Sequence, residues 1–136
     1  EVFSGVSFAL GRGEALLLKG PNGSGKTSLL RVVAGLLPTT GDNLKNGFAT
    51  AFLAAEVALK PANLLIDELS FWARLDGRGD RVADALERFD LRPLAGVPCR
   101  MLSAGQRRRA GLARLWAQDA DLWLLDEPSL GLDDAS

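Results

Sequence analysis

Short apolar runs alternate with stretches of helical periodicity along the chain. Residues 15–18, 49–54 and 122–125 are apolar runs of strand length, and they predict buried β-strands. The hydrophobic content of 47% over 136 residues is enough to bury one core, so we expect one domain rather than two independent ones.

Helical spacing of apolar residues occurs between and after these runs. Helices are expected over residues 26–37, after Pro61, and over residues 81–89 and 103–117. The first of them is expected to be buried and to end where Pro38 and Gly41 follow it. In the second, Leu65, Leu69 and Trp72 share one stripe, and Glu68 lies off it.

Residues 20–27 carry the complete phosphate-binding pattern G-x-x-x-x-G-K-[ST]. A triphosphate needs many donors within a small radius, and glycines let successive backbone N–H groups converge on it. Lys26 would reach the β- and γ-phosphates, Thr27 would bind Mg²⁺, and the following helix would point its positive end at the anion. The candidate nucleotide-binding residues here are Gly20, Pro21, Asn22, Gly23, Ser24, Gly25, Lys26, Thr27 and Ser28.

Ser103 and Gln106 have the spacing of a capping box, which predicts the start of the helix at residues 103–117. A capping box by itself only starts a helix, and it indicates a functional role only when neighbouring motifs support one. The arginines that follow, Arg107, Arg108 and Arg109, are interpreted as a solvated helix face rather than a phosphate-contacting patch.

The apolar run at residues 122–125 leads directly into Asp126 and Glu127. A buried parallel strand delivers such acids to the carboxyl edge of its sheet. Asp126 would hold Mg²⁺, and Glu127 would polarise a water beside the γ-phosphate, as a general base or water-orienting group. Beside a phosphate loop, this pair indicates nucleotide hydrolysis more than a charged turn.

Composition excludes several classes of protein. The net charge of −1 argues against a broad nucleic-acid surface, and the absence of histidine excludes His-ligated zinc or haem and Ser-His or Cys-His catalysis. Cys99 is expected to be a small packed residue. No apolar stretch approaches the roughly 18 residues needed to cross a bilayer and no signal-peptide pattern opens the chain, so we expect a cytoplasmic protein. Both ends of the chain look cut.

Four motifs follow one another along the chain: GPNGSGKT, LSAGQ, LLDEP and SLGLD. This ordered set resembles the nucleotide-binding domain of an ABC transporter. The resemblance implies an α/β fold of the ABC ATPase type, with a mainly parallel sheet and a small helical subdomain. It assigns residues 1–55 and 118–136 to an ATPase core, and residues 56–117 to the helical subdomain with the signature helix.

The same resemblance implies ATP and Mg²⁺ as cofactors and a second nucleotide-binding subunit as partner. Ser103, Ala104 and Gly105, with Gln106 beside them, would cap the γ-phosphate held by the opposite subunit of a head-to-tail dimer. Asp133 matches the loop that links the two sites across that interface.

A narrower likeness, over residues 71–75, 85–89, 102–109 and 122–128, is to the ATP-binding subunits of cytochrome c biogenesis haem exporters. It implies coupling of ATP hydrolysis to haem export or cytochrome c maturation. It also implies integral membrane permease partners and a peripheral position on the cytoplasmic side of the bacterial inner membrane. No nucleic-acid partner is expected.

The chain departs from the family pattern in places that bear on turnover. Glu56 aligns with the family's Mg²⁺-contacting glutamine, which makes it a third candidate metal ligand beside Thr27 and Asp126. The segment between the phosphate loop and Phe52 is shorter than the pattern, and the switch histidine is absent.

Two other interpretations stay open at this point. The departures favour a truncated or degenerate domain that binds nucleotide or a partner without turnover. A DNA-repair ATPase with the same head architecture is disfavoured because no coiled-coil heptads interrupt the chain and its charge is slightly acidic.

Overall fold

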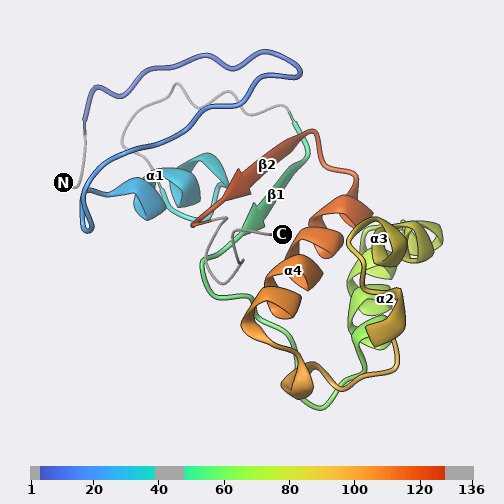
Figure 1. The fold of residues 1–136 in the computed structure, drawn as a ribbon. Helices are drawn as coiled ribbons and strands as arrows, with labels where there is room; N and C mark the ends of the chain where they lie inside the picture. The colour runs from blue at the N-terminus through green and yellow to red at the C-terminus, as the bar shows by residue number, and fades with distance from the viewer. Residues whose placement is uncertain (1–3, 39–47, 128–136) are drawn as a thin grey trace. The chain divides into compact units, whose positions relative to one another are not determined.

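A computed structural model of the chain describes residues 4–38 and 48–127. The chain divides into two compact units, residues 1–46 and residues 47–136, the N-terminal and C-terminal units (Figure 1). Within the described ranges, no helix has both the length and the apolar character required to span a membrane.

The N-terminal unit contains helix α1, Lys26–Val33. The helix ends four residues before the predicted end, because Gly35 takes a left-handed φ of +73°. The N–H of Gly35 donates to the Val32 carbonyl and that of Leu36 to the Arg31 carbonyl, which together form a Schellman motif. The expected burial is wrong as well: α1 holds no buried residue, and Leu36 is 61% exposed.

The strand predicted at residues 15–18 is not formed. This segment carries no strand assignment, and Leu16 and Leu17 are exposed. An apolar run shows where a strand could form, but a strand exists only where a neighbour accepts its ladder of hydrogen bonds. Among the described residues, the sheet consists of two later segments.

The C-terminal unit is built on two parallel strands, β1 (Thr50–Leu53) and β2 (Leu122–Leu125). Both strands were predicted from their apolar runs and both are confirmed. Thr50 pairs with Leu122 and Leu53 with Leu125, so the two strands end level with each other. The residues immediately after the two strands therefore lie at the same edge of the sheet.

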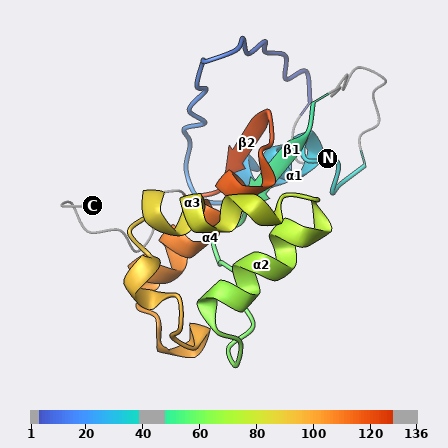
Figure 2. The same cartoon turned by 90° about the vertical axis from the view of Figure 1, so that its right-hand side faces the viewer.

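Helices make up the long connection between the strands. They are α2 (Leu65–Leu75), α3 (Val82–Arg88) and α4 (Ala104–Gln118), with short 3₁₀ turns at Gly79–Arg81, Arg92–Leu94 and Cys99–Met101. The predicted helices after Pro61, at residues 81–89 and at residues 103–117 correspond to α2, α3 and α4. Helix α4 lies between the strands and the other two helices in Figure 1, and α2 and α3 stand in front of it in Figure 2.

Helix α4 buries two faces. Ala110, Ala113 and Ala117 recur at helical spacing and pack with the apolar residues of α2 and α3. Leu115, on another face, packs with Ala51 and Leu53 of the sheet. Because small residues line the α2 and α3 side, the helices can approach closely there, and α4 becomes the element that joins both layers of this unit.

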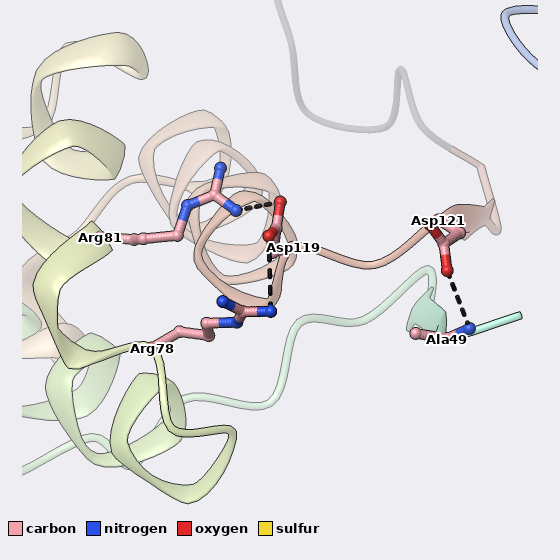
Figure 3. A network of polar contacts seen from close by, with 5 residues as sticks. All are labelled: Ala49, Arg78, Arg81, Asp119 and Asp121. Carbon is pink, nitrogen blue, oxygen red and sulfur yellow. Dashed lines mark hydrogen bonds and ion pairs between the residues drawn. The ribbon is translucent and has the colours of Figure 1, made fainter.

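The end of α4 is held by charged groups (Figure 3). Asp119 takes a left-handed φ of +56° and pairs with Arg81 and, at 3.6 Å, with Arg78. The hydrogen bond from Arg81 holds the pKa of the Asp119 carboxyl below its usual value. Asp121 Oδ2 then accepts from the backbone N–H of Ala49 at 3.3 Å, which ties the start of β2 to the start of β1.

Gly111 gives a direct test of how closely α4 approaches the sheet. A Cβ at this position would lie 2.7 Å from Leu53 Cδ1 and 3.0 Å from Val57 Cγ1. We expect Gly111→Ala to lower the free energy of unfolding by about 1–3 kcal/mol in urea titrations, although alanine is the better helix former. Gly96→Ala is the matched control, because no atom lies within 4 Å of its added Cβ. An unchanged or higher stability for Gly111→Ala would contradict the packing.

Candidate functional site

The phosphate-loop sequence folds as a tight turn that leads into α1. Gly23 and Gly25 adopt φ values of +79° and +91°, which only glycine takes readily, as the motif predicts. The N–H of Ser24 donates to the Pro21 carbonyl at 3.3 Å and closes the turn. At Gly20, an added Cβ would meet Ser24 Oγ at 2.9 Å, so the Ser24 side chain would have to rotate to accommodate it.

Lys26 is held by the loop that precedes it. Its Nζ donates to the carbonyls of Gly20 and Pro21, at 2.8 Å each. The ammonium group is thereby folded back against the turn instead of extending into solvent. A cation held at a glycine-rich turn adds a point charge to the backbone donors of that turn.

The N-terminus of α1 begins directly at this turn. Gly25 is the N-cap, and in the part of the chain that the structure describes no side chain caps this end and no acid lies in its first turn. The first N–H groups of a helix carry partial positive charge and have no partner inside the helix. The arrangement therefore suits an anion at the loop.

The capping box at the start of α4 is formed as predicted. The N–H of Gln106 donates to Ser103 Oγ at 3.2 Å, and the N–H of Ser103 donates to Gln106 Oε1 at 2.8 Å. Ser103 and Ala104 are exposed, while Gly105 and Gln106 are half-buried. The family's signature pentapeptide, LSAGQ at residues 102–106, thus presents a capped helix N-terminus at the surface of this unit.

Asp126 and Glu127 leave β2 at the carboxyl edge of the sheet, as the sequence predicts. The N–H of Asp126 donates to the Leu53 carbonyl at 2.9 Å, which continues the ladder one residue beyond β2, and Asp126 is buried. Glu127 is exposed and takes a left-handed φ of +48°. That conformation costs a non-glycine residue about 1–2 kcal/mol, so neighbouring contacts must hold it.

The contacts that hold this edge come from Arg108 of α4. Its Nη1 donates to the carbonyls of Ala54 at 2.6 Å and Ala55 at 3.3 Å, just after β1. Its Nη2 donates to the carbonyls of Asp126 at 2.6 Å and Glu127 at 2.8 Å, just after β2. One guanidinium therefore joins the ends of both strands to the signature helix.

The interpretation of Arg108 as part of a solvated helix face is wrong. The residue is only 2% exposed, whereas Arg107 is exposed and Arg109 is half-buried and pairs with Asp90. Burial lowers the pKa of the Arg108 guanidinium from its usual value, and the charges of Asp126 and Glu127 act in the opposite direction. An arginine stays protonated in proteins, so a buried positive charge contacts the backbone of Asp126 and Glu127.

A sequence signal for Arg108 did exist. It precedes Gly111, Leu112 and Leu115 at the i, i+3, i+4, i+7 spacing of one helix face, and this face packs on the sheet. A charged residue in line with a buried stripe is placed to reach polar groups in the interior. The run of three arginines obscured this, because its members point to different sides of the helix.

Comparison with known proteins fits this set of features. Residues 3–130 match the family model described as ABC transporter. The chain belongs to the ABC transporter family. It is 51% identical to the cytochrome c biogenesis ATP-binding export protein CcmA of Rhodospirillum rubrum, in an alignment that covers 99% of this chain and 64% of that protein. The protein of the same name from Mesorhizobium japonicum is 47% identical, with 99% of this chain and 73% of that protein covered.

A solved structure shows the same fold. It is described as an ABC transporter of metal-chelate type in an inward-facing conformation, and it matches with a TM-score of 0.84 at 27% identity. The match covers 94% of this chain and 55% of that one. The α/β fold of the ABC ATPase type is thus confirmed. The chain spans 64% of the length of the first relative and 73% of the second.

The predicted site residues are distributed over both units. The segment leading to Glu56, the start of α4, and Asp126 with Glu127 belong to the C-terminal unit, while the loop at residues 20–28 belongs to the N-terminal unit. Asp133 lies outside the described residues. The division of the chain into residues 1–55 with 118–136 and residues 56–117 stays a prediction.

Other titratable groups of the C-terminal unit serve its packing. The placement of Glu68 off the apolar stripe of α2 is wrong: it lies three residues after Leu65 on the same buried face, is 2% exposed, and accepts hydrogen bonds from Asn63 Nδ2 and Trp72 Nε1. Cys99 is buried, as expected, and burial raises its pKa. Over residues 4–38 and 48–127, the His, Cys, Asp and Glu side chains form no cluster of three or more that could hold a metal ion.

Proposed function

We propose that this chain is the ATP-binding part of an ABC transporter and that it hydrolyses ATP together with a second copy. The observation that carries the proposal is the set of a Lys26-bearing glycine turn, an exposed signature-helix N-terminus and a carboxylate edge in one chain of this family. Residues 20–28 would hold the triphosphate through backbone N–H groups, the Lys26 ammonium and the start of α1.

The oxygen donors of the chain suit Mg²⁺. A hydroxyl on Thr27 and carboxylates on Asp126 and Glu56 are hard ligands, and Mg²⁺ is commonly held by one or two carboxylates together with substrate phosphates. When bound, the ion would neutralise phosphate charge. Glu56 is exposed, so its carboxylate is accessible to solvent ions.

Glu127 is the proposed general base. Its exposed carboxylate follows the buried Asp126, so the two acids meet different surroundings although they are adjacent. An exposed carboxylate can reach a water molecule and accept a proton from it. In this proposal Glu127 orients or deprotonates the water that attacks the γ-phosphate.

A second copy would complete the site. Ser103, Ala104, Gly105 and Gln106 begin α4 at the surface, where the first N–H groups of the helix can receive an anion. We propose that they contact the γ-phosphate bound to the loop of the partner copy, in a head-to-tail dimer. Asp133 is proposed, on the family resemblance alone, to lie at the same interface.

The transport role is inferred from the relatives. The proteins from Rhodospirillum rubrum and Mesorhizobium japonicum are described as cytochrome c biogenesis ATP-binding export proteins. We propose that this chain couples ATP turnover to haem export or cytochrome c maturation, bound to membrane permease subunits on the cytoplasmic side of the bacterial inner membrane.

A second candidate function is nucleotide binding without turnover. Glu56 favours it, because an additional carboxylate beside a triphosphate and Asp126 is repulsive unless the metal screens it. Steady-state phosphate release by the purified protein discriminates between the two functions, since only the first requires continuous hydrolysis.

The first prediction concerns the loop. Lys26→Ala removes a charge-assisted donor, so the affinity for ATP should fall at least about ten-fold in isothermal titration calorimetry. Lys19→Ala is the matched control, because Lys19 is exposed just before the motif. Undiminished ATP affinity in Lys26→Ala would remove the phosphate-loop assignment.

The second prediction concerns hydrolysis. Glu127→Gln keeps the size of the side chain but removes the base, so ATP should still bind while steady-state kcat falls about 100-fold or more. Glu87→Gln, at an exposed position of α3, controls for the loss of one negative charge. Equal turnover in Glu127→Gln and the unmodified protein would exclude Glu127 from the mechanism.

A further inference from the structure

Arg108 contacts the backbone on both sides of Glu127. The Asp126 carbonyl belongs to the peptide that precedes the Glu127 Cα, and the Glu127 carbonyl belongs to the peptide that follows it. Peptide groups are planar, so a residue's backbone moves only through φ and ψ. A donor that holds both flanking carbonyls therefore restrains both angles and sets the direction in which the Glu127 side chain leaves the backbone.

Those angles need a restraint. Glu127 sits at a φ of +48°, which is unfavourable for a residue with a side chain. Without its contacts, the backbone would relax toward negative φ, and the carboxylate would swing to another direction. The hydrogen bonds of 2.6 and 2.8 Å from Nη2 oppose this relaxation.

The other guanidinium nitrogen, Nη1, holds the Arg108 side chain against the segment that follows β1. Nη1 binds the carbonyls of Ala54 and Ala55, immediately before Glu56, so the exits of β1 and β2 share one rigid, planar donor group. Arg108 also lies in the second turn of α4, close in sequence to Ser103. The Arg108 side chain thus joins the segment before Glu56 to Asp126 and Glu127, and its backbone belongs to the helix that begins at Ser103.

We propose that Arg108 is a positioning residue for ATP turnover, which holds the Asp126–Glu127 backbone against the end of β1 so that the Glu127 carboxylate keeps one orientation. This role rests on the proposed function. Arg108 acts through Glu127 and needs no contact with nucleotide.

Arg108→Lys tests the role while it preserves the charge. A lysine ammonium is a point donor and cannot bind the carbonyl pairs of both strands in the fixed geometry of a guanidinium. We expect kcat to fall about 100-fold, as for a misplaced catalytic group, with KM and the Kd for ATP within about two-fold. Arg109→Lys is the matched control, because Arg109 is the next residue of α4 and pairs with Asp90 at the surface.

A mutant cycle separates positioning from a general structural effect. If Arg108 acts through Glu127, then adding Arg108→Lys to Glu127→Gln should change the residual rate by no more than about two-fold. An equal loss of kcat in both backgrounds would overturn the proposal, as would an unchanged kcat or a parallel loss of ATP affinity.

Folding is checked by circular dichroism and thermal unfolding, with Arg108→Gln as a second variant. If neither variant folds, Arg108 is a structural residue and the positioning role is rejected. The unmodified protein reports on the proposed function separately: absence of turnover there refutes that function and this role with it, whereas active unmodified protein with unaffected variants refutes only the role.

Discussion

The buried guanidinium of Arg108 is the interaction on which the arrangement of the C-terminal unit depends. A buried cation is costly unless hydrogen bonds and charges compensate it. Here the backbone carbonyls just after β1 and β2 accept its hydrogen bonds, and Asp126 and Glu127 supply negative charge nearby. Removal of the guanidinium would leave those carbonyls without this donor, so the ends of the strands and the start of α4 are coupled to one another.

The packing of α4 makes that coupling possible. Its alanines pack with α2 and α3, and Gly111 allows Leu53 and Val57 to approach the helix backbone. Arg108 can reach past the strand ends only because the helix lies this close to the sheet. The capping box at one end and Asp119 at the other then determine where the helix begins and where the chain turns into β2.

Several parts of this architecture can be predicted from the sequence. The apolar runs at residues 49–54 and 122–125, and the capping box at Ser103, are local signals, and the elements they predict are formed where expected. The phosphate-loop glycines adopt the positive φ values that their motif requires.

The failures share a physical cause, which is dependence on a distant partner or on a competing local motif. The run at residues 15–18 has the composition of a strand, but composition does not supply a neighbouring strand. Gly35 ends α1 through a Schellman motif before the apolar pattern runs out. Arg108 was assigned to solvent because the carbonyls that bind it lie far away in sequence, 54 residues before it in the case of Ala54.

We propose that the phosphate loop of one copy and the signature helix of another act on the same nucleotide. Mixing two inactive variants, Lys26→Ala and Ser103→Asp, tests it most directly. Aspartate still caps a helix but places negative charge toward a phosphate. In a mixed head-to-tail dimer, the intact loop of one variant faces the intact signature helix of the other, so one of the two sites is complete. About half of the dimers in an equal mixture are mixed. The mixture should therefore recover about a quarter of the unmodified ATP turnover if the sites work independently. Turnover no greater than the sum of the two separate variants would contradict a site shared between copies.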